Sequence, residues 1–482
     1  MKPSNGVDLI EPNYLAHRQN EALDALKKGE IEQICVSVTR PVDQIVMYGL
    51  RTGFLQPALR SFPDPRKSWD VPIDILLLPQ ILQRLNDEHS LLLAPYMLNS
   101  SDLITELGYN ASVLTEGFND KAVYPRKMAF HGETLKHVLL SCRADELVKW
   151  FNQDWLTHWR QHSPGRTRQY VMDGMKIHVP LHLQKKYQGS GIVKDAEGNL
   201  TAGYKAVWIY EIIDRKGVIV GLKLGPIQTH DLALAKELVR DFPFEEGSSL
   251  IMDRGFIDAA WIKSFTQGRK IDVFLPLRHN MDITQAAIAK ADNRVLWQPH
   301  PTREGQQIAF FTDPSDLYWP GGPELKSAVL VRWKKKDGTN DEVLFVTTRA
   351  KQTAKSLLAT YDQRSEIEEA HRQMKLFQGI ETLPSKKLIQ VVFRIIMGVI
   401  GYNLLNLFLN SENCASLEDF TLKTLRQKRK QEPNVKVIVY TKTCFAVLTQ
   451  YDLFSRLLDL EGVARKKLKV LFKNLNLSPA PG

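Results

Sequence analysis

The order of strand-like and helix-like segments in the middle of the chain constrains the fold most. RQYVMDGMKIHV (residues 168–179) reads as a strand, and KAVWIYEII (205–213) with GVIVGLKLG (217–225) reads as a hairpin. A helix, a short apolar strand, a second helix and another strand follow: 232–242, 248–256, 257–265 and 270–278. This succession predicts a mixed α/β core.

The length of the chain predicts further domains around that core. A chain of 482 residues is too long for one hydrophobic core, so two to four domains are expected. Residues 1–155 are predicted to be mostly helical, and residues 165–278 form the first part of the core. Residues 279–341 are rich in Pro, Gly and Trp with short strand-like pieces, which predicts a β insertion. The core resumes over 342–410, and 411–482 form a basic, mostly helical C-terminal region.

The charge of the chain favours a polyanionic partner. The sequence contains 64 Lys and Arg against 54 Asp and Glu, a formal net charge of +10. An excess of this sign favours nucleic acid over an acidic or neutral partner. The alternative is an enzyme that is simply basic.

Cysteine usage and hydropathy indicate a soluble, reducing environment. Four scattered cysteines form no C-x-x-C pair: Cys35, Cys142, Cys414 and Cys444. Neither a zinc site nor a disulfide framework is therefore expected, which is typical of a cytoplasmic protein. The first residues contain no apolar run, so no signal peptide is expected. The long apolar stretch at 391–409 is interrupted by polar residues and is predicted to be a buried core helix, not a membrane span.

The charged stretch YDQRSEIEEAHRQMK has two interpretations. A helix turns about 100° per residue, so on a single helix Tyr361, Arg364, Glu368 and Lys375 would share one stripe opposite an apolar face. The simpler interpretation is a solvated helix face. If Ser365 is the N-cap, it forms a capping box with Glu368, and Tyr361 and Arg364 then belong to the preceding turn.

Two further acids lie where α/β sheets usually bind ligands. Asp173 lies in a strand, and Asp253 ends an apolar strand, so both are expected to project into the crevice at the sheet edge. Their structural alternatives are a turn at Asp173 and a helix cap at Asp253. Together with Glu368 they would supply three carboxylates, the ligands that Mg²⁺ takes when two ions promote phosphodiester cleavage. Arg364 and Lys375 would then contact phosphates, and Tyr361 would hydrogen-bond a phosphate or stack on a displaced base.

These residues resemble a known family, the bacterial insertion-sequence transposases of the DDE class. Four residues match the family signature Y-x2-R-x3-E-x6-K in full: Tyr361, Arg364, Glu368 and Lys375. SLIMDRGF around Asp253, the FLPLR that follows it, and YVMDG around Asp173 are similar to the family's blocks for the other two acids. The likeness covers roughly residues 168–410.

The resemblance implies a ribonuclease-H-like catalytic core, interrupted by the β insertion and flanked by the two helical domains. It implies that Asp173, Asp253 and Glu368 are catalytic and bind two Mg²⁺ ions, with Mn²⁺ as a substitute. Asp154 and Asp214 are alternatives for the first acid. It also implies cut-and-paste chemistry, in which water cleaves a phosphodiester at the transposon end and the freed 3′-hydroxyl attacks target DNA.

The resemblance also implies partners. These are double-stranded DNA, both transposon ends and target, and a second copy of the chain in a synaptic homodimer. Neither a membrane nor a small-molecule substrate is expected, and the protein would be cytoplasmic and nucleoid-associated in a bacterium. Residues 1–155 would bind the terminal repeats, and 411–482 would support dimerisation. Family members place a Trp of the insertion against a flipped base, and Trp297 is the expected residue here, with Trp319 and Trp333 as alternatives.

Other functions stay open as alternatives. One is a metal-dependent nuclease of the same fold that cuts without joining. Another is a transposase-derived protein that binds DNA without catalysis. A third treats the charged stretch as a protein-interaction face. The presence of all three acids and of the full Tyr-Arg-Glu-Lys set favours the active transposase.

Overall fold

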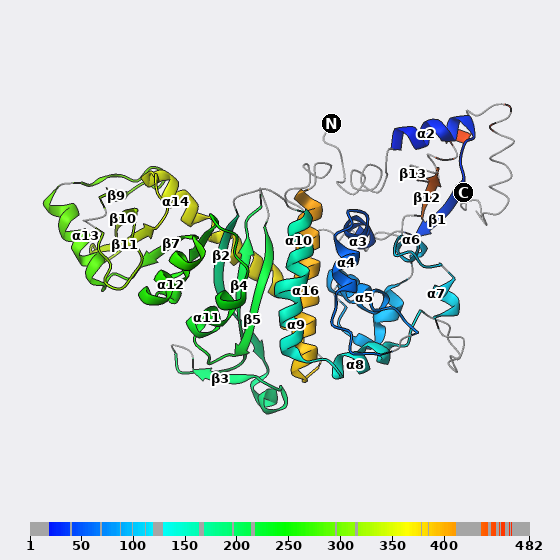
Figure 1. Cartoon of the computed structure of the whole chain (residues 1–482), viewed down its shortest axis with the longest axis horizontal. Helices are drawn as coiled ribbons and strands as arrows, with labels where there is room; N and C mark the ends of the chain where they lie inside the picture. The colour runs from blue at the N-terminus through cyan, green and yellow to red at the C-terminus, as the bar shows by residue number, and fades with distance from the viewer. Residues whose placement is uncertain are drawn as a thin grey trace. The chain divides into compact units, whose positions relative to one another are not determined.

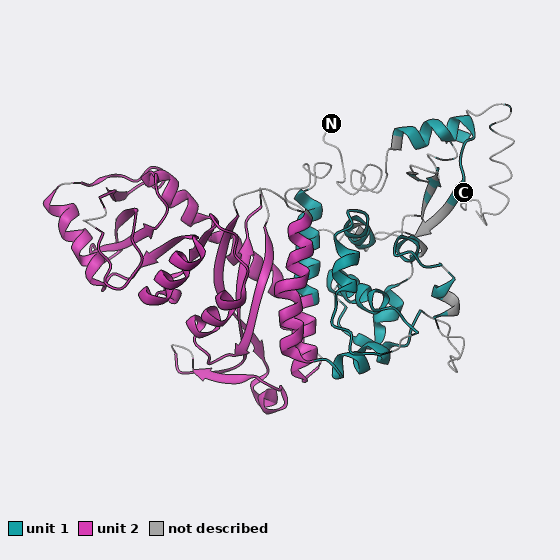
Figure 2. Ribbon diagram, viewed as in Figure 1, with its two compact units in different colours: residues 1–142, 377–379, 397–482 teal, residues 143–376, 380–396 magenta. Residues whose placement is uncertain are grey.

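The structure is a computed structural model of the whole chain (Figure 1). It describes these residues: 19–38, 41–67, 70–86, 88–98, 100–110, 112–118, 129–162, 168–194, 197–213, 217–294, 296–313, 317–376, 378–383, 385–410, 435–441, 445–449, 453, 455–457, 462 and 464. The chain divides into two compact units, coloured separately in Figure 2. Unit 1 comprises residues 1–142, 377–379 and 397–482, and unit 2 comprises 143–376 and 380–396.

Unit 1 is mostly helical. Its helices before the boundary at residue 142 are α2 (Gln19–Lys28), α3 (Pro41–Arg51), α4 (Leu55–Arg60), α5 (Ile73–Asn86), η1 (Leu91–Met97), α6 (Ser101–Glu106), α7 (Val113–Glu116) and α8 (Gly132–Leu140). A small sheet joins distant parts of the sequence, because β1 (Gln33–Val38) pairs with β12 (Val435–Tyr440), which pairs with β13 (Phe445–Thr449). The sequence predicts a strand at β12 but not at β1.

Unit 2 is built on one mixed sheet, which confirms the α/β class. Ten strands of the described residues belong to it: β2 (Gln169–Val179), β3 (Gly191–Lys194), β4 (Leu200–Glu211), β5 (Val218–Pro226), β6 (Ser249–Met252), β7 (Asp272–Leu277), β8 (Gln298–Pro299), β9 (Gln306–Phe311), β10 (Ser327–Lys334) and β11 (Asn340–Thr347). The order is β3-β4-β2-β6-β7-β11-β10-β9-β8, and β5 also pairs with β4. β2, β6 and β7 are parallel, and the other paired strands are antiparallel.

The helices of unit 2 are α9 (Ala144–Trp150), η2 (Phe151–Trp155), α10 (Leu156–His162), η3 (Leu181–Lys186), α11 (Asp231–Asp241), η4 (Arg254–Phe256), α12 (Ala259–Arg269), α13 (Asp282–Asn293), α14 (Ala354–Asp362), α15 (Ser365–Leu376) and the first part of α16 (Leu388–Asn410). Two of them, α11 and α12, lie between the strands where the sequence predicts them, at 232–242 and 257–265. The predicted β4–β5 hairpin is present, with one irregularity between Ile209 and Tyr210.

The segment expected to be a β insertion differs from that expectation in two ways. It contains the helix α13, and its strands extend the main sheet through the pairing of β11 with β7. The α13 sequence has a helical signal, since Ile283, Ala287 and Ala291 recur every four residues and are all buried. The Pro, Gly and Trp content of the surrounding residues outweighed that signal in the prediction.

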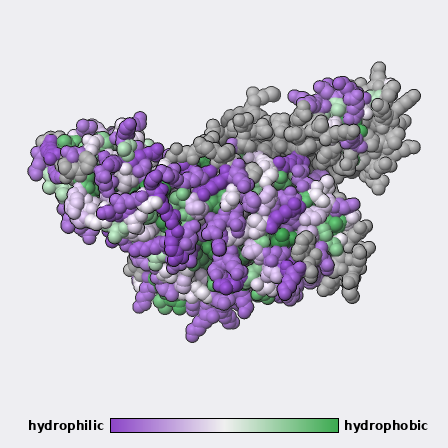
Figure 3. All heavy atoms as spheres, in the orientation of Figure 1, coloured by the Kyte–Doolittle hydropathy of each residue, from purple (hydrophilic) through white to green (hydrophobic). Residues whose placement is uncertain are grey.

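The apolar helix α16 is a core helix, as predicted. It is long and apolar enough to cross a membrane, but 89% of its most apolar 18-residue window is buried inside the structure. The polar residues that interrupt it are buried with it: Arg394, Asn403 and Asn406. On the face drawn in Figure 3, hydrophobic residues are scattered among hydrophilic ones.

Candidate active site

Asp173 and Asp253 are brought together by the register of two parallel strands. β2 pairs with β6 so that Met172 lies opposite Met252. Each acid is the residue that follows its paired methionine. The two carboxylates therefore leave neighbouring strands at the same level of the sheet.

Asp173 lies within β2, and not in a turn. One carboxylate oxygen, Oδ1, accepts a hydrogen bond from the amide of Gly174 at 2.8 Å. The glycine after Asp173 leaves room for Asp231, because a Cβ there would lie 2.5 Å from Oδ1 of Asp231 and would displace that side chain. The Asp-Gly pair of the sequence thus serves a close approach inside the sheet.

Asp253 caps a short turn and keeps one oxygen for the site. Its Oδ1 accepts from the amide of Arg254 at 2.7 Å, at the start of the three-residue η4. The following helix, α12, has a different cap, because Asp258 Oδ1 accepts from the amide of Trp261 at 2.9 Å. The helix-cap alternative for Asp253 therefore accounts for one of its two oxygens, and only at the short turn.

The signature residues do not lie on one helix. α14 ends at Asp362 and α15 begins at Ser365, so the single-helix stripe is wrong for Tyr361 and Arg364. Tyr361 lies in the last turn of α14, with its ring centroid 4.7 Å from that of Phe345. Ser365 Oγ donates to the carbonyl oxygen of Asp362 at 2.8 Å. The alternative in which α15 starts near Ser365 describes the backbone correctly.

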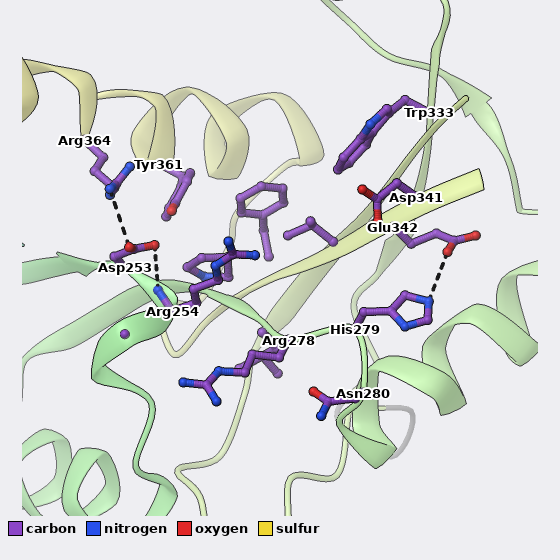
Figure 4. Close-up of a pocket in the computed structure, with 15 residues that line it drawn as sticks. Asp253, Arg254, Arg278, His279, Asn280, Trp333, Asp341, Glu342, Tyr361 and Arg364 are labelled. Atoms are coloured by element: carbon purple, nitrogen blue, oxygen red, sulfur yellow. Dashed lines mark hydrogen bonds and ion pairs between the residues drawn. The ribbon is translucent and has the colours of Figure 1, made fainter. Parts of the chain in front are cut away.

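The break between the two helices places Arg364 among the three acids. Its Nη1 lies 2.7 Å from Glu368 Oε1, one turn along α15. Its Nη2 lies 3.5 Å from Asp173 Oδ2 and 3.6 Å from Asp253 Oδ2. Figure 4 shows Arg364 beside Tyr361, with the guanidinium facing Asp253. Three carboxylates from β2, the end of β6 and α15 thus converge on one cation.

Burial and neighbouring charges shift the pKa values of Asp173, Arg364 and Tyr361. Burial raises the pKa of Asp173 to about 6, although the nearby Arg364 favours the ionised form. Burial alone would lower the pKa of Arg364, but the carboxylates of Asp173 and Asp253 outweigh it and raise that pKa. Burial also raises the pKa of the Tyr361 hydroxyl, which therefore stays protonated and able to donate at neutral pH.

Lys375 lies beyond the acid cluster. Its Nζ is 3.3 Å from Glu381 Oε1, and His178 Nδ1 is 2.9 Å from the same oxygen. Neither Glu381 nor His178 was predicted, since they lie outside every motif in the sequence. Lys375 is therefore held near the far part of β2, and its described ion pair is with Glu381.

A half-buried imidazole, that of His371, lies on the next turn of α15 after Glu368. His371 packs near Trp208, with ring centroids 6.5 Å apart, and Trp208 is the cross-strand partner of Asp173. Burial lowers the pKa of His371 to about 4, so this side chain is neutral at pH 7. Trp208 and His371 thus place two uncharged side chains next to Asp173 and Glu368.

A hollow of about 830 Å³ opens beside Asp253, Tyr361 and Arg364 (Figure 4). Its charged and polar lining comes mainly from η4, the segment after β7, and β11: Arg254, Arg278, His279, Asn280, Asp341 and Glu342. Trp333 of β10 also lines it. The hollow thus combines cations, hydrogen-bonding groups and aromatic rings next to two of the signature residues.

The three candidate tryptophans have different surroundings. Trp297 donates from Nε1 to Asp292 at 2.8 Å, and the Arg332 guanidinium lies 3.8 Å from its ring centroid. Trp319 is 6% exposed and packs in the interior. Trp333 is partly exposed and lines the hollow next to the acids.

The donor set of the cluster fits hard divalent cations. All three groups are carboxylates, and Mg²⁺ and Mn²⁺ prefer oxygen ligands. Each acid has an oxygen within 3.6 Å of the Arg364 guanidinium. In the described part of the chain, no three His, Cys, Asp or Glu side chains approach one another closely enough to share a metal ion. The guanidinium lies between the acids that would have to do so.

Comparison with known proteins places the cluster inside a recognised domain. A family model for a transposase DDE domain matches residues 164–404, half of the chain. No curated protein matches the chain. Among solved structures, the cryo-EM structure of the piggyBac transposase synaptic complex with hairpin DNA is 12% identical, with a TM-score of 0.39, and the match covers 97% of this chain and 88% of that one.

Proposed function

We propose that this chain, which belongs to the transposase DDE domain family, is a DNA transposase in which Asp173, Asp253 and Glu368 bind catalytic metal ions. The convergence of these three carboxylates on a single cation carries the proposal. Four strands (β2 to β5), the helix α11, the strand β6, the helix α12 and the strand β7 in succession support a ribonuclease-H-like core. Double-stranded DNA and a homodimer that joins two ends belong to the same proposal.

The strand acids are pre-organised for this role. Asp173 and Asp253 each anchor one oxygen to a backbone amide, which leaves the other oxygen directed at the cation. Glu368 lies on a helix, and its side chain is 56% exposed, so it can adjust its position. When bound, divalent ions supply an activated water or hydroxyl and neutralise charge on the phosphate. The protein contributes the fixed placement of the ligands.

Cations around the hollow are suited to hold the DNA backbone. Arg254 and Arg278 line it, and Arg364 lies on its border with the acids. Guanidinium groups bind phosphates through two parallel hydrogen bonds. The protonated Tyr361 hydroxyl adds a donor at the same border. DNA lying along this surface would place a phosphodiester next to the three carboxylates.

The expected base-stacking residue changes from Trp297 to Trp333. One face of Trp297 is covered by Arg332, whereas Trp333 lines the hollow. Stacking of a base on an aromatic ring contributes about 1–3 kcal/mol, so Trp333→Ala should weaken binding of an end with an unpaired flanking base by about 5- to 150-fold. Fluorescence anisotropy of labelled ends measures this loss. Trp297→Ala is the control, and an equal loss in the two variants would refute the assignment.

The decisive experiment is cleavage of DNA that carries the ends of the element encoding this protein. With Mg²⁺ we expect cutting at the end, which EDTA abolishes. Glu368→Gln removes one carboxylate charge and should slow cleavage at least about a thousandfold, about 4 kcal/mol, while end binding persists. Denaturing gels report both cleavage and any strand-transfer product.

Glu369→Gln is a matched control for that variant. Glu369 is the next residue on the same helix, and its carboxylate accepts from Arg372 at 2.6 Å, outside the acid cluster. This variant should cleave like the wild type. Equal activity of the Glu368 variant and the wild type would contradict the metal-ligand role, and cutting without joined product would indicate a nuclease.

A further inference from the structure

We propose that Arg364 is a positioning residue that takes the place of a metal ion, holding the three acids together until a divalent cation displaces its guanidinium. The inference rests on the proposed metal site. It adds that the same side chain has two successive partners: first the carboxylates, then the phosphate backbone of DNA. Metal binding and DNA binding would then be coupled through one residue.

The contacts of the acids identify Arg364 as their shared counter-charge. Across the described residues, the ion pairs of Asp173, Asp253 and Glu368 all run to Arg364. Like charges this close raise one another's cost of ionisation, and a cation between them relieves it. The guanidinium therefore explains how three carboxylates can point at one position before a metal binds.

The contacts of Arg364 also make it easy to displace. Only the pair with Glu368, at 2.7 Å, has hydrogen-bond length, whereas the pairs with Asp173 and Asp253 measure 3.5 and 3.6 Å. Its Nε is buried with no hydrogen-bond partner. No other described acid holds the guanidinium in place, so leaving the cluster breaks one good hydrogen bond.

The position of Arg364 beside the hollow allows its side chain to move away from the acids. The residue lies in the short joint between α14 and α15, where its amide donates to the carbonyl oxygen of Tyr361 at 2.9 Å and its carbonyl oxygen accepts from the amide of Ile367 at 3.2 Å. Rotation about the side-chain bonds of Arg364 moves the guanidinium and leaves both backbone hydrogen bonds in place. Arg364 also lines the hollow with Arg254 and Arg278, which face where we propose the DNA backbone lies. Displacement from the acids would move its charge toward the phosphates and add to that pair of cations.

Competition between the guanidinium and a metal ion predicts an altered metal affinity. A site that is occupied most of the time by its own arginine binds metal with an affinity reduced by the fraction of time the site is available. Removing the arginine should therefore strengthen metal binding. It should also destabilise the protein without metal, because the acids lose their counter-charge.

Thermal denaturation of the full chain without DNA tests this at pH 7.5, with Mn²⁺ as the probe. For Arg364→Gln we expect a lower melting temperature without metal, and a Mn²⁺ concentration for half-maximal stabilisation about tenfold below that of the wild type. Arg372→Gln, on the same helix with its partner Glu369, should match the wild-type Mn²⁺ dependence. Arg364→Lys retains the charge without the fork and should fall between wild type and Arg364→Gln; it serves alone if the glutamine variant does not fold.

The outcomes separate this inference from the proposed function. If Mn²⁺ stabilises the wild type and not Glu368→Gln, the metal site stands. An Arg364 variant with an unchanged or weaker Mn²⁺ dependence would then overturn the exchange of arginine for metal and leave the transposase proposal intact. Absence of any Mn²⁺ effect on the wild type would overturn the metal site and this inference together.

Discussion

Two arginines of unit 2 are each surrounded by carboxylates, and they differ in how firmly they are held. Arg168 is 5% exposed, and it donates to the buried Glu211 and, at 2.7 Å, to Glu245. Glu211 also accepts from Trp159 Nε1 at 2.9 Å. Arg364 is more exposed, has one short contact and leaves its Nε without a partner.

The difference shows that one residue type can be held firmly by carboxylates in one place and loosely in another. The Arg168 cluster ties α10, β2 and β4 together with carboxylates whose hydrogen bonds are satisfied within the protein. A buried charge that is fully paired is costly to disturb. In the Arg364 cluster, two of the three contacts between the guanidinium and the acids measure 3.5 and 3.6 Å. The carboxylates therefore stay available to other cations. Catalytic sites commonly keep such unsatisfied charge at the expense of stability.

The largest effect expected from this comparison is the loss of Arg168. Arg168→Ala leaves the buried Glu211 charge without its partner and should lower the free energy of unfolding by about 3–5 kcal/mol. Arg364→Ala should lower it by about 1 kcal/mol, because its contacts are longer and closer to solvent. Urea denaturation followed by tryptophan fluorescence compares the two variants.

Glu245→Gln is the control within the same cluster. Its side chain is 40% exposed, whereas that of Glu211 is 3% exposed, so the substitution should cost less than about 1 kcal/mol. A loss for Arg168→Ala no greater than for Arg364→Ala would refute the distinction between a structural and an exchangeable arginine.

Asp173→Asn is expected to raise the free energy of unfolding, by less than Arg168→Ala lowers it. The pKa of Asp173 is raised from the ordinary 3.8 to about 6 in the folded protein, so the folded state binds this proton more tightly than the unfolded state does. Stability from this group is therefore greatest below about pH 4 and is lost as pH rises to about 6. Asp173→Asn removes the penalty and should stabilise the metal-free protein at pH 7.5 by about 1–3 kcal/mol.

Unfolding measured at several pH values checks the sign. The gain from Asp173→Asn should shrink toward zero as pH falls from about 6 to about 4. His371, with its pKa lowered to about 4, acts on both proteins equally and cancels in the difference. A variant less stable than the wild type at pH 7.5 would show that the pairing with Arg364 outweighs the burial of Asp173.

Local sequence signals predicted the elements that carry the site. Alternating and apolar runs predicted β2, β6 and β7. Asp173 lies in β2, and Asp253 directly follows β6. The break before α15 was also readable, because Ser365 and Glu368 fit a helix start. The α13 helix had a clear four-residue repeat of buried positions and was missed only because composition was given more weight.

Other features had no local signal. β1 pairs with a strand about four hundred residues later, and such pairings cannot be read from either segment alone. The choice among three tryptophans depended on neighbours distant in sequence, since Arg332 covers Trp297 and the hollow beside the acids reaches Trp333. Glu381 meets Lys375 and His178 only after folding.

Sequence alone identified the candidate residues: three acids, an arginine, a tyrosine and a lysine in a specific order within an α/β pattern. The spacing of these residues along the chain is the same in the unfolded and the folded protein, so it can be recognised in the sequence. Folding brings Arg364 among the acids and Lys375 next to Glu381, and neither contact could be predicted from the spacing. Those contacts depend on the register of β2 with β6 and on the joint between α14 and α15, and both are set by packing between elements far apart in the sequence.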